Sequence, residues 1–309
     1  MSTYAVAVVQ AGSELFDTPR TMDKAVRLVN EAAGQGAQLV VLPEAFIGGY
    51  PKGLDFGVRI GMRSDAGRDE FRRYHDGAIT VPGPETERLG ELAGQLSIHL
   101  IAGVIERDGG TLYCTAVFLG PDGSLLGKHR KLMPTAAERV IWGTGDGSTM
   151  PVFAADEVRF GAAICWENYM PLYRTAMYDK RIDLWCAPTV DERETWQATM
   201  RHIALEGRCF VLSACQYLTR ANLPTDVHPA QGDDPDTVLI AGGSVIVGPL
   251  GDVLAGPLRG QEGILRADLD LDDLARARFD FDAVGHYARP DVFTLHVNET
   301  RQRAVDTGR

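Results

Sequence analysis

Short apolar runs alternate along the chain with stretches whose apolar residues recur every three or four positions, which predicts strands and helices in alternation. The segment 22–33 has the helical spacing, and we expect Thr18 to cap this helix with Pro19 as its first residue. Further helices are expected at 85–96, 171–180 and 195–207. Strands are expected at 4–10, 39–42, 99–104, 111–119, 125–131, 158–165, 182–187, 209–215, 243–247 and 252–255. The stretches 48–83 and 219–243 match neither pattern and are expected to be long loops at the walls of a site or at subunit contacts.

The two halves of the chain follow the same plan. An apolar strand is closed by proline at Pro43 and again at Pro188, and a turn of the form Gly-Pro-x-Gly starts at Gly120 and again at Gly248. These matches predict two related halves that build one domain about a pseudo-two-fold axis. The alternation of strands and helices, with many hairpins, also predicts mixed sheets whose outer faces are covered by helices.

The charge of the chain narrows the classes of partner. Among 309 residues, Asp and Glu number 42 and Lys and Arg number 31, so the net charge is −11. Such an acidic surface repels phosphate backbones, and no nucleic-acid partner is expected. No apolar run approaches the roughly 20 residues that cross a bilayer, and the first residues lack the basic segment of a signal peptide. We therefore expect no membrane partner and a cytoplasmic location.

The cysteines and histidines point to no cofactor. There are five cysteines, an odd number, and they form no Cys-x-x-Cys pair. Neither a disulfide framework nor a thiolate zinc site is expected from this pattern. The histidines show no metal-ligand spacing, and no dinucleotide-binding or phosphate-binding motif is present. We expect no metal and no cofactor.

Three polar residues stand where a predicted strand ends. Glu44 follows an apolar strand, Lys131 ends the return strand of a hairpin, and Cys165 ends a second apolar strand. Such positions face the crevice in which sheets of this class hold their sites. Taken singly, each residue has a plainer explanation, as a cap or surface charge, a solvated lysine or an inert core thiol. The motifs of serine hydrolases, zinc proteases and P-loop enzymes are absent.

Longer segments around these residues carry a resemblance to a known family. They are V-V-L-P-E-A-F-I-G-G-Y-P around Glu44, H-R-K-L-M-P-T-A-A-E-R around Lys131 and G-A-A-I-C-W-E-N around Cys165. Further matches are R-H-I-A-L-E-G-R-C-F-V-L-S-A-C-Q, G-G-S-V-I-V-G-P-L-G and F-D-F-D-A-V-G-H-Y-A-R-P-D-V-F. Together, over residues 4–297, they resemble the nitrilase branch of the carbon–nitrogen hydrolase family. The resemblance implies an α/β fold, a four-layer α-β-β-α sandwich with two mixed sheets and internal pseudo-two-fold symmetry.

The resemblance implies a catalytic triad of Glu44, Lys131 and Cys165, and these residue types suit attack on a nitrile. A nitrile carbon needs a strong nucleophile, which the Cys165 thiolate provides. Glu44 acts as general base in this scheme, and Lys131 favours the thiolate and then the anionic nitrogen. Glu138 matches a second glutamate of the family, which orients Lys131 or assists the second water. A plain ion pair of Glu138 with Arg139 or Lys131 is an equally good explanation.

Four further residues are expected to border the substrate: Trp166, Tyr50, Thr189 and Trp142. The backbone N–H of Trp166 is a candidate to stabilise the developing negative charge, and plain packing of its ring is the alternative. His129 lies two residues before Lys131 on the same strand face and raises a Cys–His alternative, in which the protein is a thiol protease or acyltransferase. The local context of papain-like enzymes is absent, which disfavours this alternative.

The predicted activity is that of a nitrilase, which converts an organic nitrile and two waters into a carboxylic acid and ammonia through a covalent thioimidate and thioester on Cys165. Alternatives on the same triad are a cyanide dihydratase or hydratase and an aliphatic amidase. A scaffold without activity is a rival from another class, which the intact triad disfavours. The resemblance also implies a single domain over 1–309, with its core at about 4–278. It implies an extension at 279–309 that contacts another subunit in a dimer or a larger spiral oligomer.

Overall fold

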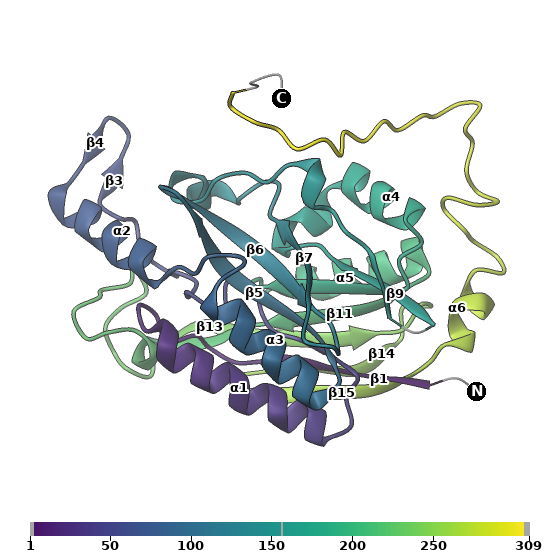
Figure 1. Ribbon diagram of the computed structural model, residues 1–309, viewed down its shortest axis with the longest axis horizontal. Helices are drawn as coiled ribbons and strands as arrows, with labels where there is room; N and C mark the ends of the chain where they lie inside the picture. The colour runs from purple at the N-terminus through teal and green to yellow at the C-terminus, as the bar shows by residue number, and fades with distance from the viewer. Residues whose placement is uncertain (1–2, 156, 306–309) are drawn as a thin grey trace.

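Two mixed sheets form the centre of the molecule (Figure 1). The computed structural model describes residues 3–155 and 157–305. The first sheet has the order β15-β1-β2-β5-β6-β7, with β1 at Thr3–Gln10, β2 at Leu39–Val41, β5 at His99–Asp108, β6 at Thr111–Leu119, β7 at Leu125–Arg130 and β15 at Gly263–Asp270. The second has the order β12-β13-β11-β10-β9-β8, and β14 also pairs with β13. Its strands are β8 at Phe153–Ala155, β9 at Val158–Ala162, β10 at Leu184–Thr189, β11 at Phe210–Cys215, β12 at Tyr217–Thr219, β13 at Val238–Val247 and β14 at Val253–Arg259.

Both sheets are built on one plan. Strands β1, β2 and β5 are parallel, β15 pairs antiparallel with the outer side of β1, and β6 and β7 continue antiparallel beyond β5. In the same way β9, β10 and β11 are parallel, β8 pairs antiparallel with β9, and β13 and β14 continue antiparallel beyond β11. The strand order therefore repeats between the halves, which confirms the predicted pseudo-two-fold symmetry.

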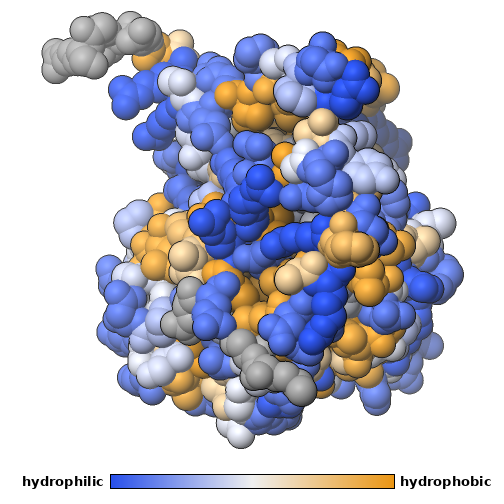
Figure 2. All heavy atoms as spheres, turned by 90° about the vertical axis from the view of Figure 1, so that its right-hand side faces the viewer, coloured by the Kyte–Doolittle hydropathy of each residue, from blue (hydrophilic) through white to orange (hydrophobic). Residues whose placement is uncertain are grey.

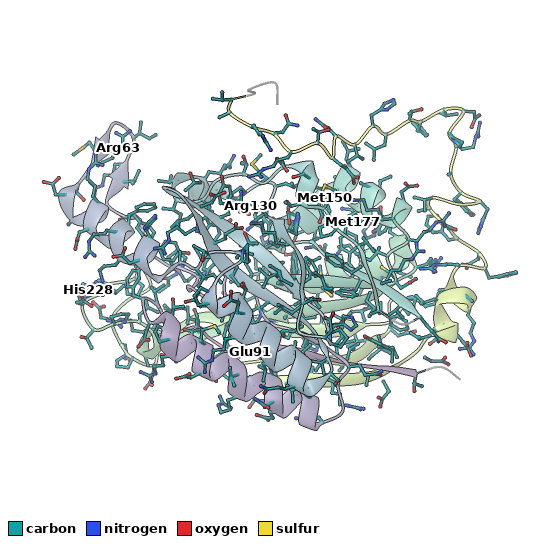
Figure 3. All side chains as sticks on the ribbon, viewed as in Figure 1. Arg63, Glu91, Arg130, Met150, Met177 and His228 are labelled. Carbon is teal, nitrogen blue, oxygen red and sulfur yellow. The ribbon has the colours of Figure 1, made fainter. Side chains whose placement is uncertain are left out.

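Three apolar cores separate four layers. In β1, Val6 and Val8 face the core between the two sheets, whereas Ala7 and Val9 face the core beneath the helices of the first half. This division follows from the two-residue period of a strand. The third core, which includes Met177, labelled in Figure 3, lies between the second sheet and its helices. The covering helices are α1 at Thr18–Gly34, α3 at Pro84–Leu96, α4 at Pro171–Asp179 and α5 at Glu194–Gly207. The predicted four-layer sandwich is confirmed.

The first helix begins with a different cap from the one predicted. The Asp17 carboxylate accepts from the Arg20 N–H at 3.0 Å and is the N-cap of α1, whereas Thr18 is already helical. The Thr18 hydroxyl donates instead to the carbonyl of Gly77, which lies 59 residues further along the chain. The sequence left two capping residues side by side, and this tertiary contact decides between them.

The stretch 48–83 is not the long loop that the sequence predicts. It holds a small hairpin of β3 (Val58–Arg59) and β4 (Met62–Arg63), and the helix α2 (Asp65–Gly77), which project from the body of the molecule in Figure 1. Arg63 lies near the end of this projection in Figure 3. Of the α2 residues only Gly67 and Tyr74 are buried, so the apolar face is too narrow to produce a helical pattern in the sequence.

The chain leaves the sandwich after α6 (Asp272–Ala277) and continues as an extended segment. Residues 278–305 contain no helix or strand and run along the outside of the molecule (Figure 1). Contacts that hold the segment to the body include the Gln302 N–H on Asp146 (2.7 Å) and the ion pair of Arg181 with Asp282 (3.1 Å). Hydrophobic groups interrupt the polar surface on this side of the molecule (Figure 2). No helix among the residues that the structure describes is long and apolar enough to cross a membrane.

Candidate active site

Glu44 is fully buried directly beyond β2, where the chain turns sharply. Ala45 takes φ +48°, and the Gln216 side chain donates to the Glu44 carbonyl at 2.7 Å, which holds the turn. The carboxylate oxygen Oε1 accepts from Lys131 Nζ at 2.7 Å. The other oxygen, Oε2, is buried and has no hydrogen-bond partner among the described residues. One oxygen of this carboxylate is therefore free to accept a proton from a reacting group.

Lys131 follows β7, and its side chain is buried between two carboxylates. Nζ donates to Glu44 at 2.7 Å and to Glu138 Oε2 at 2.8 Å. Burial by itself lowers the pKa of Lys131, but Glu44 and the other anionic groups around it outweigh burial and raise the pKa well above its usual value. The ammonium group therefore stays charged and supplies a fixed positive charge inside the protein.

Cys165 lies at a strained turn beyond the second sheet. The sequence predicts a strand up to this residue, but β9 ends at Ala162, and Cys165 opens the 3₁₀ turn η3 (Cys165–Tyr169) with φ +49°. The Asn168 amide donates to the Cys165 carbonyl at 2.7 Å, and the Thr189 hydroxyl donates to Sγ at 3.3 Å. A residue other than glycine at positive φ is strained, and these hydrogen bonds stabilise the turn that exposes the thiol to a cavity.

The surroundings of the Cys165 thiol favour its protonated form. Burial, followed by the negative charge of Glu44, raises the pKa of Cys165, and the opposing effect of Lys131 is smaller. Burial also raises the pKa of Glu44, and Lys131 and the neighbouring Cys165 thiol offset part of the rise. Lys131 alone therefore does not maintain a thiolate.

Glu138 belongs to the same buried network. It lies in the 3₁₀ turn η1 (Ala136–Val140), and besides Lys131 it accepts from the Thr135 N–H at 2.6 Å and from the Tyr50 hydroxyl at 2.8 Å. Every carboxylate oxygen of Glu138 is thus occupied, in contrast to Glu44. The geometry supports the role of orienting Lys131, and the predicted pair with Arg139 is absent, since Arg139 donates to the Ala136 carbonyl.

A cavity of about 220 Å³ opens at Cys165. Two of the expected pocket residues, Tyr50 and Trp166, line it together with Glu138. Thr189 contacts the nucleophile through its hydroxyl instead. Trp142 lines a neighbouring cavity of about 370 Å³, where its ring packs edge-on against Tyr50. The remaining residues around the first cavity are Lys52, Thr135, Val190, Asp191, Glu192 and Arg193.

Two charged residues beside Trp166, Asp191 and Arg193, were not predicted from the sequence. Asp191 accepts from the indole N–H of Trp166 at 2.9 Å, and Arg193 binds Asp191 and lies over the indole ring, 5.0 Å from its centre. Both residues follow directly after the strand that ends at Thr189. The same reasoning that selected Glu44, a polar residue beyond an apolar strand, could have found them.

His129 does not support the Cys–His alternative. Its Nε2 faces the Glu167 carboxylate at 2.9 Å and its Nδ1 faces the Thr149 carbonyl, so both ring nitrogens have partners other than the thiol. No group of three or more histidine, cysteine or acidic side chains in the described part of the chain is arranged to hold a metal ion.

Comparisons with known proteins identify the family of the chain. The model of the carbon–nitrogen hydrolase family matches residues 5–279. The chain is 59% identical over 307 residues to an aliphatic nitrilase of Sinorhizobium fredii, and the match covers 99% of each chain. It is 56% identical over 305 residues to nitrilase 2 of Arabidopsis thaliana, and this match covers 96% of this chain and 89% of the relative. It is also 59% identical over 302 residues to a bifunctional nitrilase/nitrile hydratase of Lupinus angustifolius, covering 96% of this chain and 86% of the relative.

A solved structure supports the fold. The protein XC1258 of Xanthomonas campestris, a member of the same superfamily with an arsenic adduct in its active site, superimposes with a TM-score of 0.72 at 21% identity, covering 96% of this chain and 100% of that one. At this identity the likeness concerns the architecture alone. With the family model spanning most of the chain and relatives above 50% identity, the chain belongs to the carbon–nitrogen hydrolase family, in its nitrilase branch.

Proposed function

We propose that this protein is a nitrilase, a hydrolase of carbon–nitrogen bonds other than peptide bonds, that acts on a small organic nitrile. The observation that carries the proposal is a single cluster: the Glu44 carboxylate, with one free oxygen, binds Lys131 and neighbours the Cys165 thiol, which opens to a cavity. The three come from segments far apart in the sequence, at Glu44, Lys131 and Cys165. The relatives named above, which carry the name nitrilase, support the choice of a nitrile as substrate.

The first half of the reaction forms a thioimidate. Cys165 Sγ bonds to the nitrile carbon while its proton moves to Glu44 Oε2, and one π bond of the nitrile breaks toward nitrogen. The positive charge of Lys131 stabilises the negative charge that develops there. Glu44 then returns the proton to nitrogen, which leaves a neutral thioimidate and an ionised Glu44.

The second half releases the products. Glu44 takes a proton from a water that adds to the thioimidate carbon, and delivers it to the nitrogen of the tetrahedral intermediate. The hydroxyl proton of this intermediate moves to nitrogen as the C–N bond breaks, which releases ammonia and leaves a thioester. A second water hydrolyses the thioester to the acid and the free Cys165 thiol. Cleavage of the C–S bond instead releases an amide. The bifunctional relative makes this second outcome the one to test beside the first.

The proposal is tested by incubating the purified protein with aliphatic and aromatic nitriles, cyanide and the matching amides, and by measuring ammonia, acid and amide. We expect ammonia and acid from at least one nitrile, and no turnover in Cys165→Ala. Cys186→Ala is the control, because Cys186 is a buried thiol in the core between the sheets and is expected to leave turnover unchanged. Turnover of amides without turnover of any nitrile would overturn the proposal in favour of an amidase.

We also infer that the protein self-associates through the extension after α6. Phe279, Tyr287 and Phe293 in this segment expose 88%, 59% and 78% of their surface, and exposed apolar side chains of this kind mark sites of association. A dimer or larger oligomer is expected in sizing chromatography with light scattering, and Phe293→Ser should weaken it. A monomer at all concentrations would contradict this inference. The cytoplasmic location stays a prediction of the sequence.

A further inference from the structure

A buried ion pair lies behind the nucleophile and takes no part in the chemistry described above. The side chains of His129 on β7 and Glu167 in η3 are both fully buried, with Nε2 at 2.9 Å from Oε2 and 3.1 Å from Oε1. Neither residue lines the cavity at Cys165. A buried pair of this kind is weak evidence for stability, because burying two charges costs about as much as their attraction returns. Its retention next to the active site calls for another explanation.

The Glu167 carboxylate joins the two catalytic segments through their backbones. Oε1 accepts from the N–H of Leu132 at 2.7 Å, and this residue directly follows Lys131. Oε2 accepts from the N–H of Ile164 at 2.7 Å, and this residue directly precedes the nucleophile. Because the two oxygens belong to one rigid carboxylate, they limit the separation between the backbone that carries the ammonium group and the backbone that carries the thiol.

His129 holds the carboxylate in this orientation. Its Nδ1 points at the carbonyl of Thr149, in the 3₁₀ turn η2 (Gly147–Thr149), and its Nε2 points at the Glu167 carboxylate. A carbonyl and a carboxylate can only accept hydrogen bonds. Both ring nitrogens therefore act as donors, and the imidazole is in its cationic form. Burial lowers the pKa of His129, and the charge of Lys180 lowers it further. The negative charge of Glu167 and the Thr149 carbonyl act in the opposite direction, and together they raise the pKa above its usual value.

We propose that Glu167, held by His129, is a positioning residue that fixes Lys131 and the strained turn at Cys165 relative to each other. The turn needs such support because Cys165 has φ +49°. Glu167 supplies it by accepting the hydrogen bond from the N–H of the preceding residue, Ile164. The inference rests on the proposed function for the choice of substrate, and on geometry for everything else. A displacement of about 1 Å at reacting groups lowers rates by roughly 100-fold.

The test compares Glu167→Gln with Asp183→Asn. Asp183 is a matched control because it is also a buried acid that accepts from a backbone N–H, that of Arg159 (3.0 Å), and from a cation, Arg278 (2.7 Å). It differs in location, because it precedes β10 and lies at the opposite end of that strand from Thr189. Two quantities are measured: kcat and KM for the nitrile that the wild-type protein converts, and the rate at which iodoacetamide alkylates Cys165, read by peptide mass spectrometry.

We expect Glu167→Gln to lower kcat by about 10- to 100-fold with KM within about threefold, and to change the alkylation rate of Cys165, while Asp183→Asn leaves all three within about twofold of wild type. Glutamine in place of His129 can still donate near the Nε2 position, whereas asparagine donates near the Nδ1 position. His129→Gln should therefore keep more activity than His129→Asn, and this comparison decides the matter if Glu167→Gln does not fold.

Two results would overturn the inference: a folded Glu167→Gln protein whose kcat and alkylation rate match those of Asp183→Asn, or equal activities of His129→Gln and His129→Asn. Failure of the proposed function has a different signature. In that case the wild-type protein converts no nitrile, while the alkylation rates still report whether Glu167 controls the geometry at Cys165.

Discussion

A single methyl group at Gly103 is expected to displace the general base. Gly103 lies on β5, beside the turn that carries Glu44. A Cβ atom added there would lie 2.1 Å from the Pro43 carbonyl oxygen, 2.8 Å from the Ala45 nitrogen and 2.8 Å from the Glu44 Cα. Backbone atoms on both sides cannot swing away as a side chain can. Gly103 does not have positive φ, so the effect of Gly103→Ala is steric and not one of backbone strain.

The size of the effect follows from these distances. Ordinary van der Waals contact begins at about 3.4 Å, so β5 and the Glu44 turn must separate by about 1 Å. A movement of this size breaks the 2.7 Å contact between Glu44 and Lys131, or strains it, and misplaces Oε2 relative to the thiol. We expect turnover to fall by about 100-fold. Overpacking of this kind also lowers the free energy of unfolding by about 1–3 kcal/mol.

The assay is ammonia release at saturating nitrile, together with urea unfolding to show that the variant is folded. Gly110→Ala is the control, because Gly110 lies in the turn between β5 and β6, a Cβ atom there meets nothing within 4 Å, and its φ is not positive. Gly110→Ala should match the wild-type protein in both measurements. Folded Gly103→Ala with turnover within about threefold of Gly110→Ala would show that the position of Glu44 does not limit the reaction.

Three further predictions follow from the charges at the site. Since burial raises the pKa of Glu44, turnover should be lost on the acid side with a midpoint above pH 4.5, and a pH–rate profile with a lower midpoint would contradict the role of Glu44 as base. Tyr50→Phe leaves Oε1 of Glu138 without its donor, so turnover should fall by about tenfold or more; unchanged kinetics would show that this hydrogen bond is dispensable. The pKa of His129 is raised in the folded protein, so its contribution to stability is present below about pH 6.5 and is lost as the pH rises through the folded-state pKa. The difference in unfolding free energy between wild type and His129→Asn should therefore shrink toward alkaline pH in urea titrations, and a constant or growing difference would argue against a cationic imidazole.

The sequence pattern was sufficient for elements with a complete apolar face. The strands at 4–10 and 111–119 are observed within one residue of their predicted bounds, as is the helix at 195–207, because each buries a regular set of side chains. The helix α2 was missed for the opposite reason, since little of it is buried. The cap of α1 was misplaced because adjacent Asp17 and Thr18 are both good caps, and only the contact of Thr18 with Gly77 separates them.

The sequence by itself determined the family, through its motifs, and selected Glu44, Lys131 and Cys165 as the candidate catalytic residues, because an apolar strand that ends in a polar residue marks the edge of a sheet. Only the tertiary structure decided their burial, the charges that shift their pKa values, and the contacts that support them. Whether the Cys165 thiol is ionised depends on burial and on which charges lie within a few ångströms, and neither quantity is visible in a linear pattern. The same holds for Glu167, whose two backbone partners are 35 and 3 residues away along the chain and meet only when the two sheets pack together.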